Sequence, residues 1–122
     1  ILWFSAIAST VMENTILIAS IIPLVTDMAQ TILPSGQDLK SIIQHPTLMP
    51  VWWSLALGTC LGGNATPIGA SANIVTLGLA EKAGYPVSFR KYLIYGIPLT
   101  IEMIILSTVY IWLRYYVLKF YL

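Results

Sequence analysis

Two short polar stretches interrupt an otherwise apolar sequence, and they carry the side chains best suited to ion binding. The first is Glu13-Asn14-Thr15, and the second is GGNATPIGASAN at residues 62–73. Carboxylate, amide and hydroxyl oxygens are ligands of the type that small, hard cations prefer. A carboxylate such as Glu13 can also take up and release a proton. The chemistry to consider first is therefore the binding of Na⁺ or H⁺.

Residues for covalent catalysis are poorly placed by comparison. Cys60 and Ser71 are possible nucleophiles, but the sole histidine, His45, lies in a predicted surface loop. No HExxH, GxSxG or P-loop motif is present, and no cluster of cysteine and histidine has zinc-site spacing. The single cysteine excludes an internal disulfide, and its apolar neighbours predict a packed thiol. We therefore expect no enzyme activity, and no cofactor other than a coupling ion.

The composition indicates that the elements holding these residues lie in a membrane. The 122 residues are 57% hydrophobic and 9% charged, whereas a soluble domain has about 25% charged residues. The net charge of +1 and the absence of a basic patch argue against nucleic acid. We expect an all-α, multi-pass integral membrane protein in contact with lipid. Because the sequence begins inside an apolar segment, we also expect it to be the C-terminal part of a longer protein.

The first apolar block, residues 1–26, contains Glu13 at its centre. A carboxylate at mid-bilayer costs about 2.5 to 3.5 kcal/mol or more. Either a straight helix turns Glu13 toward other helices, or the block is a re-entrant hairpin with its tip near residues 12–15. Each arm of such a hairpin would have about 11 residues and reach mid-membrane at 1.5 Å per residue. Ser5, Ser9 and Glu13 share one helix face, which suits either helix packing or a cavity lining.

The second apolar block, residues 48–80, predicts a discontinuous transmembrane helix. Gly62 and Gly63 are poor helix formers, so the first arm is expected to end there. Thr66 is a good N-cap and Pro67 is favoured at the first helical position, so a second arm is expected to begin at Pro67. Such a break leaves free carbonyl groups, which attract cations, and free N–H groups, which attract anions. The alternative is a simple kink with packed asparagines.

The second arm presents a polar stripe. Its polar and small residues fall on one helix face, and Asn64, Thr66 and Asn73 supply oxygens suited to Na⁺. Discontinuous helices of this kind mark the mid-membrane sites of secondary transporters. The face consists of Thr66, Gly69, Ala70, Asn73, Thr76 and Ala80.

The remaining segments are two loops and a last helix. Residues 27–47 are expected to form an extracytoplasmic loop with a short interfacial helix, opened by a capping box of Ser35 and Asp38. Residues 81–91 are expected to be a cytoplasmic loop, because they carry most of the basic residues near membrane ends. Residues 92–122 are expected to be the last transmembrane helix and the C-terminal end. Glu102 inside this helix is a further candidate for a functional role.

These features together resemble a known superfamily of ion transporters. The segment LGTCLGGNATPIGASANIVTLGLAEKAGYPVSFRKYLIYGIPLT, residues 57–100, is similar to the branch with arsenite permeases, NhaD-type Na⁺/H⁺ antiporters and the melanosomal P protein. Divalent-anion/Na⁺ symporters are more distant members. The signature is GGN-x-T-x-IGA-x-AN, followed by a Gly-Tyr-x-x-Ser-Phe loop. The Glu13-Asn14-Thr15 stretch resembles the tip of the family's second re-entrant hairpin, where aspartate is more usual than glutamate.

The resemblance implies inverted repeats, an elevator-type mechanism, often a homodimer, and an ion and substrate site between hairpin tip and helix break. It also implies Na⁺ or H⁺ as the coupling ion, with Asn14, Asn64 and Thr66 as possible Na⁺ ligands. The site residues that it transfers to this sequence are Glu13, Asn14, Thr15, Gly63, Asn64, Thr66, Gly69, Ser71 and Asn73.

Three functional classes are then to be weighed. The favoured one is an ion-coupled secondary transporter, or permease, for an inorganic ion or small anion. The alternative is a membrane scaffold or assembly subunit that does not transport, in which the helix breaks are packing kinks. An intramembrane enzyme is the third, and it requires a nucleophile and base that this sequence does not offer.

Overall fold

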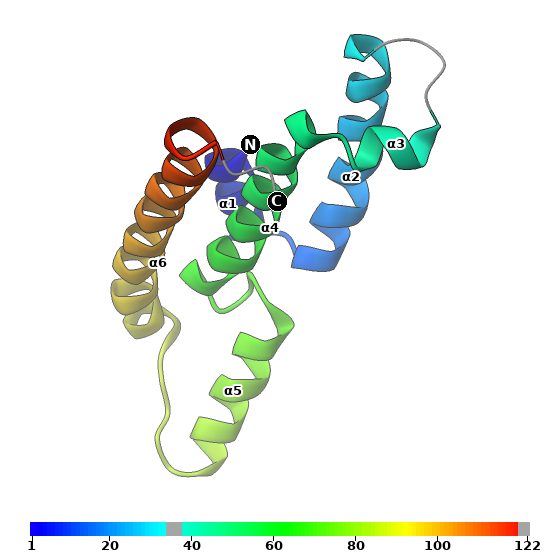
Figure 1. The fold of residues 1–122 in the computed structure, drawn as a ribbon. Helices are drawn as coiled ribbons and strands as arrows, with labels where there is room; N and C mark the ends of the chain where they lie inside the picture. The colour runs from blue at the N-terminus through cyan, green and yellow to red at the C-terminus, as the bar shows by residue number, and fades with distance from the viewer. Residues whose placement is uncertain (34–37, 120–122) are drawn as a thin grey trace.

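The computed structural model describes residues 1–33 and 38–119, and the regular structure in these residues is helical throughout (Figure 1). This confirms the expected all-α class. The elements in order are α1 Leu2–Ser9, α2 Asn14–Ile32, α3 Leu39–Ile43, the 3₁₀ turn Pro46–Leu48, α4 Met49–Gly62, the 3₁₀ turn Gly63–Ala65, α5 Ser71–Lys82 and α6 Phe89–Trp112, which continues as a π-helical turn Leu113–Val117.

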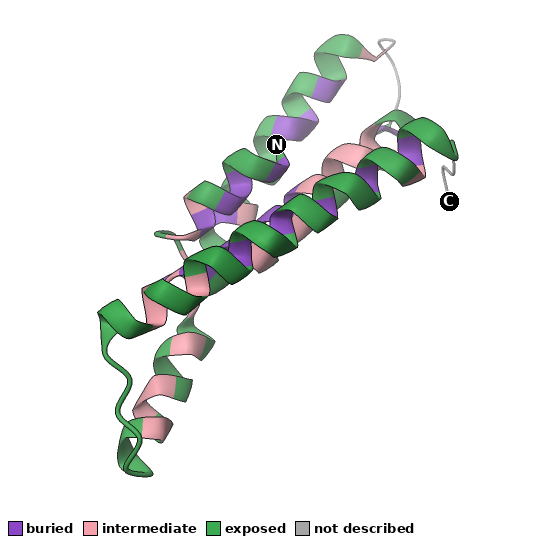
Figure 2. Ribbon diagram, turned by 90° about the vertical axis from the view of Figure 1, so that its left-hand side faces the viewer, coloured by how far each residue is buried: buried purple, intermediate pink, exposed green. Residues whose placement is uncertain are grey.

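Two of these helices are long and apolar enough to cross a membrane. They are α2, Asn14–Ile32, and α6 with its extension, Phe89–Val117. Only 22% and 17% of their most apolar windows are buried, whereas the core helix of a soluble protein would be mostly buried. Figure 2 shows the exposed residues along the outer side of α6. An apolar helix exposed in this way is stable in lipid or against further protein, so the fold is that of a membrane protein.

The first apolar block is broken where the sequence predicts, but its arms are unequal. α1 has 8 residues and α2 has 19, so the expectation of two arms of about 11 residues is wrong. The residues after Ile22 continue the helix to Ile32, past the boundary expected at residue 26. Figure 1 shows α1 running toward the turn and α2 running back from it. Whether this pair re-enters the membrane stays a prediction.

The second apolar block is broken at Gly62–Gly63, as expected, but the new helix starts later than expected. α5 begins at Ser71 and not at Pro67. Thr66 does cap a turn, because the N–H of Gly69 donates to its Oγ1 at 3.0 Å. Ala70 is then extended, with φ −147° and ψ 137°, and this ends the turn before a helix can propagate.

The core is small and is centred on the contact between α1 and α4. Gly58 and Gly62 are four residues apart, which lets two helix backbones approach closely. A Cβ on Gly58 would lie 2.4 Å from the carbonyl oxygen of Leu2, and one on Gly62 would lie 2.6 Å from Cα of Ala6. α6 closes this core with Ile104 and Ile111, and its π-helical extension adds Tyr115; all three cluster with Leu2 and Ala6.

Several peripheral expectations have definite outcomes. A short helix, α3, lies in the segment 27–47, with Asp38 at its N-cap but without a side-chain capping bond. Ser35, the other half of the expected capping box, lies outside the described residues. Cys60 is exposed, so the expectation of a packed thiol is wrong for this chain. Arg114 lies over three aromatic rings at one end of α6, those of Trp53, Tyr110 and Tyr115.

Candidate ion and solute site

Four helix ends meet at the two breaks. They are the C-terminal ends of α1 and α4 and the N-terminal ends of α2 and α5. Helix C-termini present carbonyl oxygens and attract cations, whereas N-termini present N–H groups and attract anions. The junction therefore brings both kinds of group close together, on the inner side of α6 (Figure 1).

Asn14 and Gly63 form one close link between the hairpin tip and the broken helix. A Cβ on Gly63 would lie 2.9 Å from Oδ1 of Asn14, and also 2.9 Å from the carbonyl oxygen of Gly69. Gly63 itself is buried and Asn14 is half-buried. A side chain here would push the Asn14 amide away and would also press against the backbone carbonyl of Gly69. Two of the residues that the resemblance transfers are thus in direct contact.

Ser9, the last residue of α1, ties the same region together. Its side chain is completely buried. Its Oγ lies 2.7 Å from the carbonyl oxygen of Thr59 in the last turn of α4, and it also hydrogen-bonds to the Asn14 side chain. One serine therefore contacts three helix ends. The sequence pattern placed Ser9 on a small polar face and gave it no partner.

Thr66 and Gly69 join the break to the end of α1. The Thr66 hydroxyl donates to the carbonyl oxygen of Thr10 while it accepts from the N–H of Gly69. A Cβ on Gly69 would lie 2.6 Å from the carbonyl oxygen of Gly63 and 2.8 Å from that of Ser9. Gly69 is thus another position where two backbone segments approach so closely that no side chain fits.

Asn73 closes the helix break. Its Nδ2 donates to the carbonyl oxygen of Gly63 at 2.9 Å and to that of Thr66 at 3.0 Å. Two carbonyl groups at the break are therefore satisfied by one side-chain amide. Among the described residues no hydrogen bond to Oδ1 of Asn73 is recorded, so this oxygen is the acceptor that Asn73 still offers.

Glu13 and Thr15 form an ordinary helix cap. Glu13 is the N-cap of α2, and its carboxylate accepts from the N–H of Thr15 at 2.9 Å and from the Thr15 hydroxyl at 3.3 Å. A negative charge at a helix N-terminus is favourable. This bond gives Glu13 a structural role that the sequence interpretation did not include, next to any role in proton exchange.

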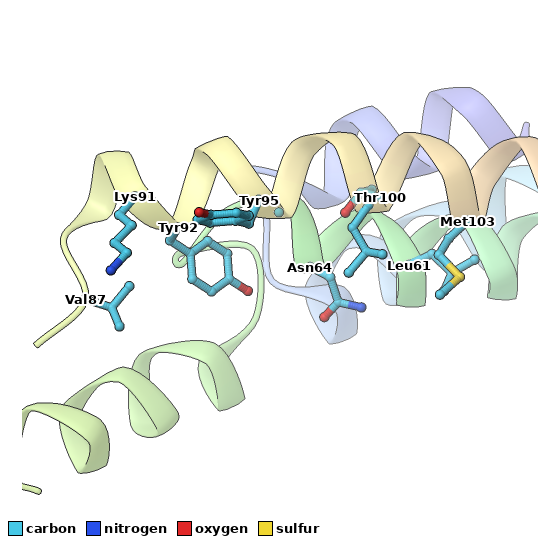
Figure 3. A pocket seen from close by; sticks show the side chains of 10 residues that line it. Leu61, Asn64, Val87, Lys91, Tyr92, Tyr95, Thr100 and Met103 are labelled. Carbon is cyan, nitrogen blue, oxygen red and sulfur yellow. The ribbon is translucent and has the colours of Figure 1, made fainter. Parts of the chain in front are cut away.

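Asn64 lies apart from this cluster. Its side chain is exposed and lines a pocket of about 550 Å³ against α6, together with Tyr92, Tyr95 and Thr100 (Figure 3). The Thr100 hydroxyl is buried and has no hydrogen-bond partner among the described residues. The three expected Na⁺ ligands are therefore not all brought together, because Asn14 and Thr66 contact the end of α1 and Asn64 faces α6.

Ser71 and Glu102 are the two candidate residues whose side chains are exposed and lie outside the contacts described above. Ser71 is the first residue of α5 and is exposed. The residue before it, Ala70, provides no side-chain cap, so the first N–H groups of α5 have no capping side chain. Glu102 is exposed in the middle of α6. An exposed carboxylate on an apolar helix needs a partner from another protein segment or from water.

The junction offers neutral oxygens rather than a cluster of charged ligands. In residues 1–33 and 38–119 no group of three or more histidine, cysteine or acidic side chains is arranged to hold a metal ion. The oxygens available at the junction are amide, hydroxyl and backbone carbonyl oxygens. This donor set suits a weakly held alkali cation better than a resident transition metal.

Sequence reasoning missed residues whose importance lies only in their contacts. Gly96 on α6 is one, since a Cβ there would lie 3.0 Å from the carbonyl oxygens of Asn64 and Ala65. Gly58 is another, at the contact with α1. The spacing of Gly58 and Gly62 is a recognisable signal for close helix packing, and it could have identified the α1–α4 contact.

Comparison with known proteins gives relatives over most of the chain. A protein named as an uncharacterized transporter from Mycobacterium bovis is 42% identical over 118 residues, which is 97% of this chain. A 46 kDa membrane protein from Mycobacterium leprae is 36% identical over 94% of the chain. The human P protein is 39% identical over 83% of the chain. The resemblance to the branch containing the P protein is thereby confirmed.

The aligned region is only part of each relative. The chain spans about a quarter of the length of the mycobacterial relatives and about a tenth of the length of the human P protein. No family model matches the chain, and no solved structure matches it.

Proposed function

We propose that this chain, a homologue of mycobacterial proteins named as transporters and of the P proteins, forms one half of the ion and solute site of a secondary transporter. The cargo is an inorganic ion or a small anion, moved by an elevator-type mechanism. The observation that carries the proposal is the meeting of four helix ends through Asn14, Gly63, Ser9 and Asn73. Discontinuous helices meeting in this way are how secondary transporters build their sites.

Na⁺ or H⁺ is the proposed coupling ion. Asn14 and the carbonyl groups around the break would hold Na⁺, and Glu13 would exchange a proton. The uncapped start of α5 at Ser71 favours an anion nearby, because its N–H groups carry partial positive charge. Thr15, Gly63, Thr66, Gly69 and Asn73 shape this space, and Asn64 would reach it from the α6 side.

The partners in this proposal are the remaining N-terminal part of the transporter, membrane lipid and a second copy of the whole protein. The exposed apolar faces of α2, α5 and α6 support the first two. The same faces support a multi-pass position in the membrane.

A membrane scaffold without transport is the second candidate, and one observation favours it. Asn73 uses both hydrogens of its amide to close the break, as a packing kink would require. In this alternative the polar residues serve the fold alone, and no ion gradient affects the protein.

The full-length protein in proteoliposomes distinguishes the two candidates. Na⁺ and pH gradients are imposed separately, and Na⁺ uptake and internal pH are followed with a panel of small anions in the buffer. A transporter gives flux that depends on one of the gradients. Flux equal to that of empty vesicles under every gradient and anion contradicts the transporter and supports the scaffold.

A further inference from the structure

The buried hydroxyl of Ser9 has more neighbours than hydrogens. It carries one hydrogen, yet two atoms lie within hydrogen-bonding distance, the carbonyl oxygen of Thr59 at 2.7 Å and Oδ1 of Asn14. Both of these are acceptors. A single hydrogen cannot serve both at once, so one oxygen–oxygen contact in this arrangement has no hydrogen between its atoms.

A half-turn of the Asn14 amide removes this conflict. The two ends of an amide have nearly the same size and shape, so the rotation needs no additional room. With Nδ2 toward Ser9, the amide donates to the hydroxyl, and the hydroxyl donates to Thr59. Oδ1 then turns away from Ser9. Both ends of the amide lie over Gly63, where a Cβ would be 2.9 Å from Oδ1 and 3.3 Å from Nδ2.

We infer that Ser9 is a positioning residue that sets which end of the Asn14 amide is available at the helix break. This inference rests on the proposed function, because it assigns Oδ1 of Asn14 as the atom that binds Na⁺. With Ser9 donating to Thr59, the Asn14 amide is held with its oxygen free for the cation. Without the hydroxyl, either end of the amide can face the break, and half of the orientations present hydrogens to the cation.

The geometry of Ser9 is particularly suited to this role because Thr59 fixes the direction of its hydrogen. The carbonyl oxygen of Thr59 also accepts the N–H of Gly63, so its position is set by the last turn of α4. The position of the Ser9 hydroxyl is therefore tied, through the Thr59 carbonyl, to Gly63, which is also the residue that the Asn14 amide contacts. Movement of the hairpin tip relative to α4 would break this arrangement.

Ser5 provides a matched control. It lies one turn earlier on the same face of α1 and is equally buried, with both serines 0% exposed. Among the described residues its hydroxyl has acceptors only in its own segment, the carbonyl oxygens of Ile1 at the N-cap of α1 and of Leu2, and its single hydrogen points to one of them at a time. Removing the Ser5 hydroxyl therefore tests the effect of losing a buried serine on α1 without altering Asn14.

The experiment compares Ser9→Ala with Ser5→Ala in the full-length protein. Two quantities are measured: the Na⁺ concentration giving half-maximal flux in proteoliposomes, and the rise in unfolding temperature that Na⁺ causes in detergent. Ser9→Ala is expected to raise the half-maximal concentration about twofold, because only half of the amide orientations then present the oxygen to the cation, with little change in maximal flux. Ser5→Ala is expected to match the wild type in both measurements.

Ser9→Cys is the second variant, because Ser9→Ala also removes a buried hydrogen bond and can impair folding. A thiol is a weak donor, so its half-maximal concentration should fall between those of wild type and Ser9→Ala. Equal Na⁺ dependence in wild type, Ser9→Ala and Ser9→Cys overturns the role of Ser9 and leaves the transporter intact. Proton-driven flux without Na⁺ dependence also overturns it. Absence of any flux from the wild type overturns the proposed function itself.

Discussion

The Asn14 amide occupies the space that a side chain on Gly63 would need, so the tip of the hairpin and the end of the broken helix lie side by side. A Cβ on Gly63 would come within 2.9 Å of Oδ1 of Asn14. These residues are far apart in sequence, and each lies at a point where a helix is interrupted. The contact joins the two halves of the candidate site, and the predictions below depend on it.

Gly63→Ala is expected to reduce flux strongly. The added methyl group would displace the Asn14 amide and crowd the Gly69 carbonyl, and overpacking of this kind costs about 1 to 3 kcal/mol. Gly78→Ala is the control, because Gly78 lies within α5 and a Cβ there meets nothing within 4 Å. It should keep wild-type flux and stabilise α5 by about 1 kcal/mol. Equal flux in both variants would contradict the close contact of Asn14 with Gly63.

Gly62→Leu is expected to separate α1 from α4. Even a Cβ at this position would lie 2.6 Å from Cα of Ala6, and the rest of a leucine has no room. The measurement is the unfolding temperature of the full-length protein in detergent, which should fall by several degrees, since overpacking costs about 1 to 3 kcal/mol or more. An unchanged unfolding temperature would show that the two helices do not pack through this glycine.

Asn73→Ala is expected to lower stability, because the carbonyl oxygen of Gly63 then loses its hydrogen-bond donor. An unsatisfied buried acceptor costs about 1 to 3 kcal/mol. Asn64→Ala is the comparison, since the Asn64 side chain is exposed and its removal should change stability by less than about 0.5 kcal/mol. Thermal unfolding without Na⁺ measures both. Equal stabilities would mean that Asn73 does not hold the break closed.

Glu13→Gln separates the helix cap from the charge. Glutamine keeps an oxygen that can accept from the Thr15 N–H, whereas Glu13→Ala removes the cap and should cost about 1 kcal/mol of stability. If Glu13 exchanges protons with the coupling ion, Glu13→Gln should abolish proton-coupled flux while its unfolding temperature stays close to that of the wild type. Proton coupling that persists in Glu13→Gln would limit Glu13 to the capping role.

The breaks themselves were predictable from residue types, and their partners were not. Gly62 and Gly63 ended α4 as helix propensity predicts, and the polar tip at Glu13 began a new helix. The start of α5 was wrong by four residues, Pro67 against Ser71. Thr66 did cap a turn, but Ala70 adopted an extended conformation that no local rule predicts.

The candidate site, like the helix breaks, could be predicted only in part from the sequence. The closeness of Asn14 to the break followed from the family resemblance and from no periodicity in the sequence. Asn64 and Asn73 are chemically identical, yet one lines a pocket against α6 and the other closes the break. The link made by Ser9 was missed because a buried serine on a helix usually bonds to its own backbone, as Ser5 does. Distinguishing the two requires the position of α4.

The most direct test of the ion site is Na⁺-dependent flux by Asn14→Ala in the full-length protein, compared with wild type at equal amounts of reconstituted protein. Asn14→Ala removes the amide at the junction without adding volume. Asn64→Ala is measured beside it, because Asn64 is another expected Na⁺ ligand but lies apart from the junction. We predict that Asn14→Ala abolishes Na⁺-dependent flux and the Na⁺-induced rise in unfolding temperature, while the protein stays folded. Wild-type flux and a wild-type Na⁺ response in Asn14→Ala would contradict an ion site at the meeting of hairpin tip and helix break.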